Sequence, residues 1–284
     1  MIIAITGPTG VGKTKLSVML AKKYNAIVIN ADATQIYKEL NIGSAKITEE
    51  EKEGVEHFLF DIKHPLEDYS VADYQKDARS LLEKYKDRNI IVCGGTGLYL
   101  KALFNDYIFD KTNDIKYDDL TNEQLYDLAI KKDPNMLIHK NNRVRLINFL
   151  NKENITNQKD NKLYDVIYIG LTSDRSIIYD KVNKRVDKMF DMGLLEEVKS
   201  LYQKYPDSTI LKRAIGYKEI IKYLNNEISL EEAKELIKKN TRHYVKRQYT
   251  WFNNQMDIKF FEVKDDFNIT YCEITSFIES LNSK

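Results

Sequence analysis

The sequence has few of the residues on which several protein classes depend. Its two cysteines, Cys93 and Cys272, are far apart and form no CxxC pair. This argues against a disulfide framework or a zinc cluster and fits a reducing compartment. The four histidines form no HExxH or similar metal-ligand spacing. Glycine (11) and proline (4) are scarce, which favours a helix-rich protein with few long loops.

Long apolar runs and an excess of one charge are also missing. No apolar run approaches the roughly 18 residues of a membrane span, so we expect a cytoplasmic protein without a membrane partner. Lysine and arginine (44) nearly balance aspartate and glutamate (43), so any nucleic-acid site must be a local patch. The 284 residues contain 43% hydrophobic side chains, enough for a sizeable core. We expect a monomer.

Strand and helix patterns alternate along the chain. Short apolar runs are typical of buried strands, and apolar residues repeated on one helical face indicate helices. We expect strands at residues 1–6, 26–30, 57–62, 89–93, 165–171 and 258–263. We expect helices at residues 13–23, 71–85, 174–192, 194–205, 213–225 and 231–252. This alternation predicts an α/β fold with a parallel sheet flanked by helices.

The pattern changes in the middle of the chain. Residues 106–133 hold eight acidic residues against four lysines, and Thr121 and Gln124 have the spacing of a capping box that opens a helix. Residues 151–164 are polar and rich in asparagine and lysine. We therefore expect a small helical insertion domain at residues 106–164, within a core formed by residues 1–105 and 165–284.

A phosphate-binding motif follows the first predicted strand. It fits GxxxxGK[ST] with Gly7, Pro8, Thr9, Gly10, Val11, Gly12, Lys13 and Thr14. Such a loop points several amide N–H groups at one anion, beside the positive end of a helix. Lys13 adds a cation, and the Thr14 hydroxyl can ligate Mg²⁺. The motif predicts a P-loop NTPase-like sheet that binds a di- or triphosphate, but it does not identify the rest of that ligand.

Asp32 comes just after the second predicted strand, at the edge of the sheet where the phosphate loop also lies. Three roles are open from the local sequence: a ligand on the Mg²⁺ side, a general base, or a helix N-cap. A second carboxylate, Asp61, ends the segment Phe58-Leu-Phe-Asp61, which weakly resembles a strand with a metal-side aspartate.

A second glycine loop, with Gly94, Gly95, Thr96 and Gly97, also links a strand to a helix. Its amides could hold another anion or let a base approach closely. The alternative is tight packing between strand and helix.

The C-terminal helices carry a local positive charge. Residues 211–250 contain ten lysines and arginines against five acidic residues, with aromatic residues between them. Cations beside stacking platforms suit a nucleic-acid backbone with unstacked bases. The alternative is a solvated helix face over a buried aromatic stripe. Taken alone, Arg185 is predicted to be a surface cation.

Taken together, these stretches resemble the tRNA dimethylallyltransferase family over nearly the whole chain. The matching segments come in order: residues 7–14, 32–37, 43–46, 69–74, 94–99, 185–189, 213–219, 241–248 and 251–252. The resemblance implies transfer of a dimethylallyl group from dimethylallyl diphosphate, with Mg²⁺, to N6 of adenine 37 next to the anticodon. It also implies that the substrate tRNAs are those that read codons beginning with U.

The resemblance also implies roles for individual residues. Thr9 and Arg185 match positions that contact the pyrophosphate, and Asp32 matches the base that takes the N6 proton. The insertion matches a domain that grips the anticodon stem. The positions that match tRNA contacts are Asp32, Ala33, Thr34, Gln35, Thr96, Arg145, Arg213, Gly216, Tyr217, Lys218, Arg242, Lys246, Arg247 and Gln248.

Two positions depart from the family pattern. Ala33 stands where a serine usually follows the aspartate, and Asn148 stands where the insertion usually has a second arginine. Three other functions are compatible with the motifs: a small-molecule P-loop kinase, a prenyltransferase acting on free adenine nucleotides, and a non-catalytic RNA-binding NTPase.

Overall fold

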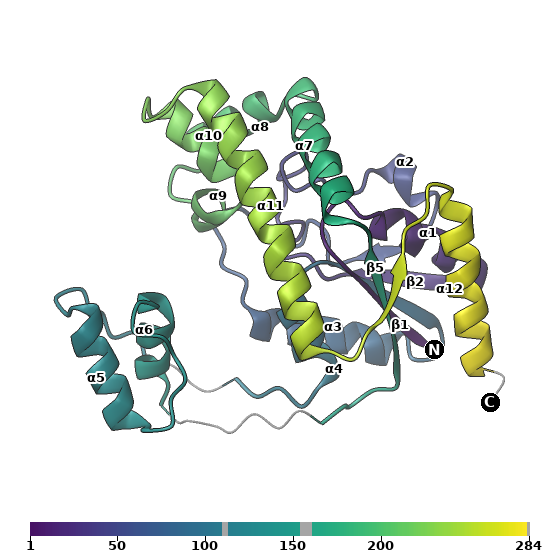
Figure 1. Ribbon diagram of the computed structural model, residues 1–284, viewed down its shortest axis with the longest axis horizontal. Coiled ribbons are helices and arrows are strands. Elements are labelled where there is room, and N and C mark those ends of the chain that lie inside the picture. Colours follow the sequence, from purple (N-terminus) through teal and green to yellow (C-terminus); the bar gives the residue numbers. More distant parts are fainter. Residues whose placement is uncertain (110–112, 154–160, 283–284) are drawn as a thin grey trace. The chain divides into compact units, whose positions relative to one another are not determined.

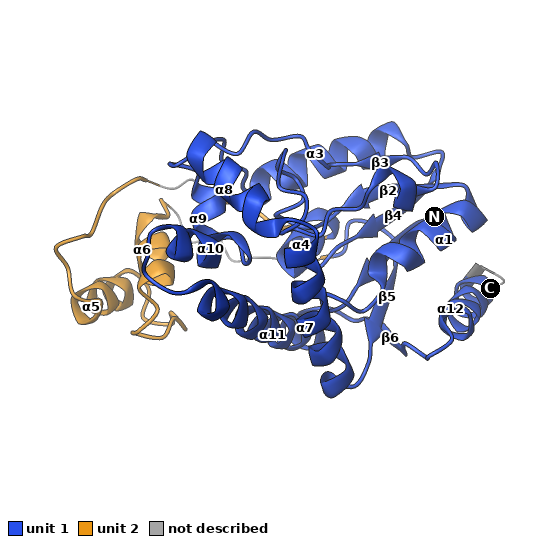
Figure 2. Ribbon diagram, turned by 90° about the horizontal axis from the view of Figure 1, so that it is seen from above, with its two compact units in different colours: residues 1–104, 162–284 blue, residues 105–161 orange. Residues whose placement is uncertain are grey.

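The computed structural model describes residues 1–109, 113–153 and 161–282. Two compact units make up the chain (Figure 2). The larger unit contains Met1–Phe104 and Lys162–Lys284, and the smaller one contains Asn105–Asn161, which interrupts the first in the sequence. Within the described residues, no helix is both long enough and apolar enough to cross a membrane.

The larger unit is built on one sheet whose neighbouring strands are all parallel. The strand order is β3-β2-β4-β1-β5-β6. The strands are β1 (Ile2–Thr6), β2 (Ala26–Asn30), β3 (His57–Phe58), β4 (Asn89–Cys93), β5 (Val166–Thr172) and β6 (Lys259–Glu262). Because β2, β4 and β1 lie next to one another, the loops that follow them meet at one edge of the sheet.

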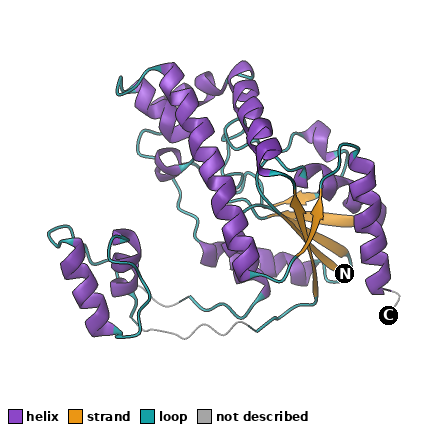
Figure 3. Cartoon of the chain, in the orientation of Figure 1, coloured by secondary structure: helices purple, strands orange, loops and turns teal. Residues whose placement is uncertain are grey.

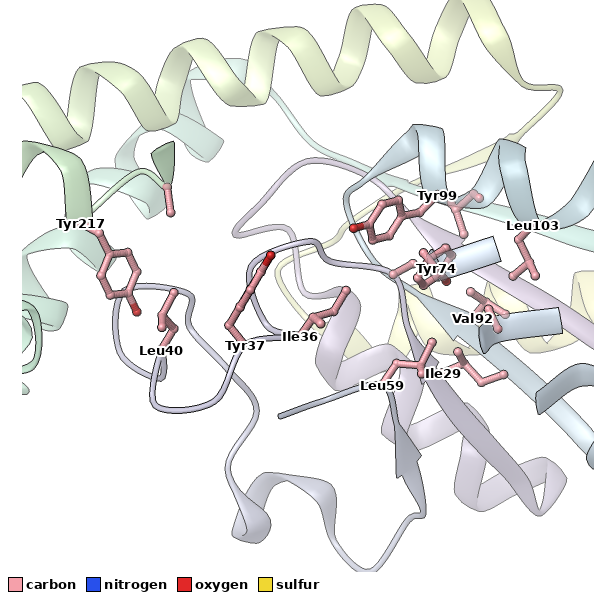
Figure 4. Close-up of a cluster of buried hydrophobic side chains, with 14 of the residues drawn as sticks. Ile29, Ile36, Tyr37, Leu40, Leu59, Tyr74, Val92, Tyr99, Leu103 and Tyr217 are labelled. Atoms are coloured by element: carbon pink, nitrogen blue, oxygen red, sulfur yellow. The ribbon is translucent and has the colours of Figure 1, made fainter. Parts of the chain in front are cut away.

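Helices cover both faces of this sheet (Figures 1 and 3). Along β1 the side chains alternate: Ile3 and Ile5 enter one hydrophobic core and Ala4 enters the other. The first core includes Leu16 of α1, and the second includes Tyr74 of α3 stacked on Tyr99 of α4, with ring centroids 4.0 Å apart (Figure 4). Because these strands are buried on both faces, their sequences are continuous apolar runs.

The helices of the larger unit connect the strands and form the C-terminal part. They are α1 (Lys13–Tyr24), α2 (Glu49–Lys52), α3 (Val71–Lys84), α4 (Gly97–Phe104), α7 (Arg175–Asp191), α8 (Leu194–Lys204), α9 (Thr209–Arg213), α10 (Tyr217–Leu224), α11 (Leu230–Gln255) and α12 (Phe267–Asn282). Ser229 and Glu232 cap α11 reciprocally, as the sequence predicts.

Three sequence-based expectations for this unit were wrong. The strand expected at residues 57–62 ends at Phe58, because Leu59 and Asp61 have φ of 63° and 53°. The helix expected at residues 213–225 begins only at Tyr217, since Gly216 has φ of 96° and interrupts the helical path. No helix was expected at α12, although Ile274 and Ile278 are spaced by four residues and both are buried.

The smaller unit contains α5 (Asn122–Lys132) and α6 (Arg143–Asn151) around a separate core. The capping box predicted for α5 is confirmed: the Thr121 hydroxyl accepts from the Gln124 N–H, and the Gln124 side chain accepts from the Thr121 N–H. The Arg143 guanidinium donates to the carbonyl oxygens of Tyr117 and Leu120 and closes the loop before α5.

Candidate active site

The phosphate loop connects β1 to α1 at the C-terminal edge of the sheet. Gly10 and Gly12 have φ of 80° and 101°, which lets the chain curl between strand and helix. Gly12, the N-cap residue of α1, has no side chain to cap the helix, so the first amides of α1 have no capping partner on that residue. Amides at the start of a helix, together with the helix dipole, suit an anion, and we call this part of the phosphate loop the cradle.

Lys13 is the cation of this cradle, and its ammonium donates to the Pro8 carbonyl oxygen at 2.8 Å. Burial lowers the pKa of Lys13 from 10.5 to about 8. Cys93 and Asp32 oppose this shift, whereas the positive Arg185 adds to it. A bound anion would favour the charged form of this lysine and would raise its pKa again.

Thr9 is held on two sides within the loop. Its hydroxyl accepts a hydrogen bond from Arg185 Nη1 at 3.2 Å, and its backbone N–H donates to Gln248 Oε1 at 3.0 Å. Arg185 lies on α7 with its side chain directed at the phosphate loop, so the surface-cation interpretation of this residue is wrong. Burial lowers the pKa of the Arg185 guanidinium, and the nearby charge of Asp32 opposes that change.

Asp32 lies just beyond β2 and caps no helix. Its Oδ1 accepts from the Thr34 N–H at 2.9 Å, while its own N–H donates to Asn30 Oδ1 at 2.9 Å. This turn fixes the backbone of Asp32 and leaves the second carboxylate oxygen without a hydrogen bond from the described residues. The general-base and metal-side interpretations both fit this geometry, whereas the N-cap interpretation does not.

Two cavities meet at these residues. The larger, about 520 Å³, runs along the phosphate loop past Gly12, Lys13 and Thr14. The smaller, about 310 Å³, is bordered by the C-terminal helices. The residues that line both cavities are Thr9, Asp32, Ser44, Arg185 and Met189. A ligand in one cavity would therefore contact the same side chains as a ligand in the other.

Most of the predicted tRNA contacts in the larger unit surround the smaller cavity. Its lining includes Asp32, Ala33, Thr34, Thr96, Arg213, Gly216, Lys218 and Arg247. Gln35 lines the larger cavity instead, and its amide donates to the Ser44 and Ala45 carbonyl oxygens. Lys246 is exposed beside Arg247, and the Arg242 guanidinium donates to Asn183 at 2.7 Å. Arg145 is exposed on α6 of the smaller unit.

Two of those predicted contacts do not fit the structure. Tyr217 is completely buried, and its hydroxyl donates to Glu197 at 2.7 Å. Gln248 is 4% exposed, and both the oxygen and the nitrogen of its carboxamide form hydrogen bonds within the protein. Neither side chain is accessible to an RNA, because neighbouring helices and loops cover them.

The second glycine loop serves packing. The Gly94 N–H donates to the Ile5 carbonyl oxygen and the Thr96 N–H to that of Ala31, so neither amide is free for an anion. A Cβ on Gly94 would lie 2.2 Å from the Ala31 backbone, and one on Gly97 would lie 2.1 Å from the Trp251 ring. These contacts support the packing interpretation and leave the Gly94 and Thr96 amides no part in holding a second anion. Because Thr96 also lines the smaller cavity, the alternative that a base approaches this loop stays a prediction.

The metal-side interpretation of Asp61 is also wrong. Its carboxylate pairs with the Lys46 ammonium at 2.5 Å and lines neither cavity. Within the described residues, no three His, Cys, Asp or Glu side chains cluster as potential metal ligands. Thr14 lines the larger cavity and is exposed.

A family model described as IPP transferase matches residues 35–255, well over half of the sequence. The chain belongs to the IPP transferase family. The tRNA dimethylallyltransferase of Fusobacterium nucleatum is 45% identical over 276 residues, covering 92% of this chain and 91% of that protein.

Solved structures of IPP transferases agree with this assignment. The full-length tRNA isopentenylpyrophosphate transferase of Bacillus halodurans has a TM-score of 0.79 and 40% identity, covering 98% of this chain and 95% of that one. A eukaryotic dimethylallyltransferase, captured in crystals acting on tRNA, has a TM-score of 0.83 and 27% identity over 98% of this chain and 79% of that one.

This IPP transferase also contains a residue near the site that the sequence did not single out. Glu197 on α8 accepts hydrogen bonds from the consecutive N–H groups of Asn41, Ile42 and Gly43 and from the Tyr217 hydroxyl. These bonds hold the loop of residues 41–44 in place, and Ser44 of this loop lines both cavities. No local pattern signals this role, because its backbone partners lie more than 150 residues away in the sequence.

Proposed function

We propose that the chain transfers a dimethylallyl group from dimethylallyl diphosphate to N6 of adenine 37 in tRNAs that read codons beginning with U, and releases pyrophosphate. The observation that carries this proposal is the wall of Thr9, Asp32 and Arg185 shared by the two cavities. One cavity has the amide cradle and lysine that a diphosphate requires. The other is bordered by cationic helices. Relatives named for this reaction support the same assignment.

The chemistry follows from the weakness of the nucleophile. The lone pair of an adenine N6 amine is delocalised into the ring, so attack on an allylic carbon requires loss of the amine proton. In the proposed step the N6–carbon bond forms, the carbon–oxygen bond to the diphosphate breaks, and Asp32 accepts the proton. Lys13, Arg185 and the loop amides stabilise the charge that develops on the departing pyrophosphate.

Mg²⁺ fits this site as a companion of the diphosphate. Because Mg²⁺ is commonly bound by one or two protein ligands together with substrate phosphates and water, the single hydroxyl of Thr14 is a sufficient protein ligand. Bound there, Mg²⁺ would neutralise charge on the leaving group.

The tRNA would bind through cations on both units. Around the smaller cavity these are Arg213, Lys218 and Arg247, with Lys246 next to them. Taking the adenine out of its stack costs a few kcal/mol, which phosphate contacts and stacking offset. We further propose that residues 106–164 contact the anticodon stem through Arg145, and that the protein acts as a cytoplasmic monomer.

The decisive experiment incubates the chain with dimethylallyl diphosphate, Mg²⁺ and unmodified tRNA, followed by mass analysis of the nucleosides. We expect adenosine that carries one five-carbon unit. The Asp32→Ala variant should still bind tRNA while its turnover falls by about 10² to 10⁴. Unchanged turnover in that variant would remove Asp32 from the mechanism.

Two acceptor controls separate the other functions. Prenylation of AMP in preference to an anticodon stem-loop would identify a nucleotide prenyltransferase. Transfer of phosphate from ATP to a nucleoside, without prenylation, would identify a kinase. ATP hydrolysis with no use of dimethylallyl diphosphate would identify an RNA-binding NTPase.

The placement of the RNA is tested through its dependence on salt. Lys246→Ala should weaken tRNA binding and make the slope of log affinity against log salt shallower by about one. A slope equal to that of the unmodified protein would place Lys246 outside the RNA contact.

A further inference from the structure

Gln248 connects the two glycine loops from the inside of the protein. Its Oε1 accepts from the Thr9 N–H at 3.0 Å, and its Nε2 donates to the Gly95 carbonyl oxygen at 3.0 Å. Because the Thr9 N–H can only donate and the Gly95 carbonyl can only accept, one orientation of the carboxamide satisfies both partners. The side chain is 4% exposed and lines neither cavity.

The surroundings of Gln248 are shaped to admit its carboxamide. A Cβ on Gly95 would lie 2.3 Å from Nε2 of Gln248, so a glycine at position 95 leaves the space that the amide fills. One turn earlier on α11, the Tyr244 hydroxyl donates to the same Gly95 carbonyl oxygen at 3.5 Å. The helix is thereby attached to the second glycine loop at two successive turns.

The partner of Gln248 in the phosphate loop is the residue at the centre of the site. Thr9 lines both cavities, and the Arg185 guanidinium donates to its hydroxyl. Arg185 and Gln248 therefore fix the side chain and the backbone of Thr9 separately. A glutamine suits this task because it accepts and donates without a charge, whereas a carboxylate there would face the Gly95 carbonyl without a proton to share.

We infer that Gln248 is a positioning residue, which holds Thr9 of the phosphate loop in place for the transfer and makes no contact with the RNA. The inference rests on the proposed function and differs from the role that family resemblance gives this position. Arg247, its neighbour on α11, lines the smaller cavity with an exposed side chain and is the matched comparison.

The first test compares Gln248→Met with Arg247→Ala in the full-length protein. Methionine fills a similar space without either hydrogen bond. We expect Gln248→Met to lower kcat at saturating tRNA and dimethylallyl diphosphate by about 10²-fold, since small displacements of a reacting group have that effect. Its Kd for tRNA should stay within about twofold, whereas Arg247→Ala should raise that Kd and keep most of kcat.

The second test uses Gln248→Glu and the dependence of its activity on pH. Once protonated, the introduced carboxyl group accepts from Thr9 and donates to Gly95, as the amide does. The ratio of its kcat to that of the unmodified protein should therefore rise as the pH falls. Dividing by the unmodified protein removes every effect of pH that the two proteins share. This variant also carries the test if Gln248→Met does not fold.

A binding measurement separates this inference from the proposed function. Calorimetry with inorganic pyrophosphate needs no turnover, and Gln248→Met should bind it about tenfold more weakly. If the unmodified protein does not prenylate tRNA but this loss is found, the function is wrong and the positioning role stands. If tRNA is prenylated and Gln248→Met loses tRNA affinity with kcat and pyrophosphate binding intact, the positioning role is overturned.

Discussion

The two glycine loops follow adjacent strands and look alike in sequence, but they use glycine for different physical reasons. In the phosphate loop, Gly10 and Gly12 have positive φ, and only Phe267 crowds the second of them. In the second loop, Gly94 and Gly97 have no such φ, yet a Cβ on either would overlap neighbouring atoms. The first loop therefore needs the conformational freedom of glycine, and the second needs its small volume.

This difference separates a loop that suits an anion from a loop that packs a strand against a helix. At the start of α1 the phosphate loop has Gly12, which provides no side-chain cap for the first amides, and it adds Lys13. The second loop commits the Gly94 and Thr96 amides to backbone carbonyls and is covered by Gln248 and Trp251 of α11. A glycine-rich turn between strand and helix becomes a binding site only where its N–H groups stay unpaired.

The largest expected effect is that of Gly94→Ala. The new methyl group would lie 2.2 Å from the Ala31 backbone, which cannot move without displacing β2 and Asp32 after it. We expect the free energy of unfolding to fall by about 3 kcal/mol, the upper range for overpacking, as measured by urea denaturation. A loss below about 0.5 kcal/mol would show that the second loop has spare volume.

The next effect concerns the cation that only the phosphate loop has. Because the pKa of Lys13 is lowered to about 8, its charge is lost as the pH rises through that value. Binding that requires this charge should become about tenfold weaker between pH 7 and pH 9, as measured by calorimetry with dimethylallyl diphosphate. Lys13→Met should bind weakly at both pH values, without this dependence. A parallel decline in that variant would assign the effect to another group.

The smallest effect is that of Gly10→Ala. Its φ of 80° is unfavourable for alanine, but the nearest atom to the new Cβ is Val182 Cγ2 at 3.5 Å, an ordinary contact. We expect a stability loss of about 1 kcal/mol in the same urea experiment. A loss as large as that of Gly94→Ala would remove the distinction between the two loops.

Local signals in the sequence were enough for much of the fold. The strands at residues 26–30 and 89–93 have the predicted bounds, because buried parallel strands are uninterrupted apolar runs. The capping boxes at Thr121 and Ser229 fix their helices through contacts within four residues. The break before Tyr217 was missed, since a lone glycine in a helical pattern does not reveal its φ.

Only part of the candidate site could be predicted from local signals in the sequence. The motif identified the phosphate loop, and the common edge at which parallel strands end predicted that Asp32 lies near it. The partners of Thr9 are separated from it by 176 residues in the case of Arg185 and 239 in the case of Gln248. Such contacts depend on how α7 and α11 pack, and no local spacing encodes that packing. The family resemblance implied that Gln248 contacts the tRNA, whereas this residue is buried.

The order of the strands has a consequence for the size of what can react. β4 lies between β1, which leads into the cradle, and β2, which leads into Asp32. Two interstrand spacings therefore set these strand ends about 10 Å apart. The backbone hydrogen bonds of the sheet fix this spacing, so no surface substitution changes it. In the proposed reaction the reactive carbon is bonded to the diphosphate itself, so a donor with a single phosphate seated in the cradle would hold that carbon too far from the amine beside Asp32.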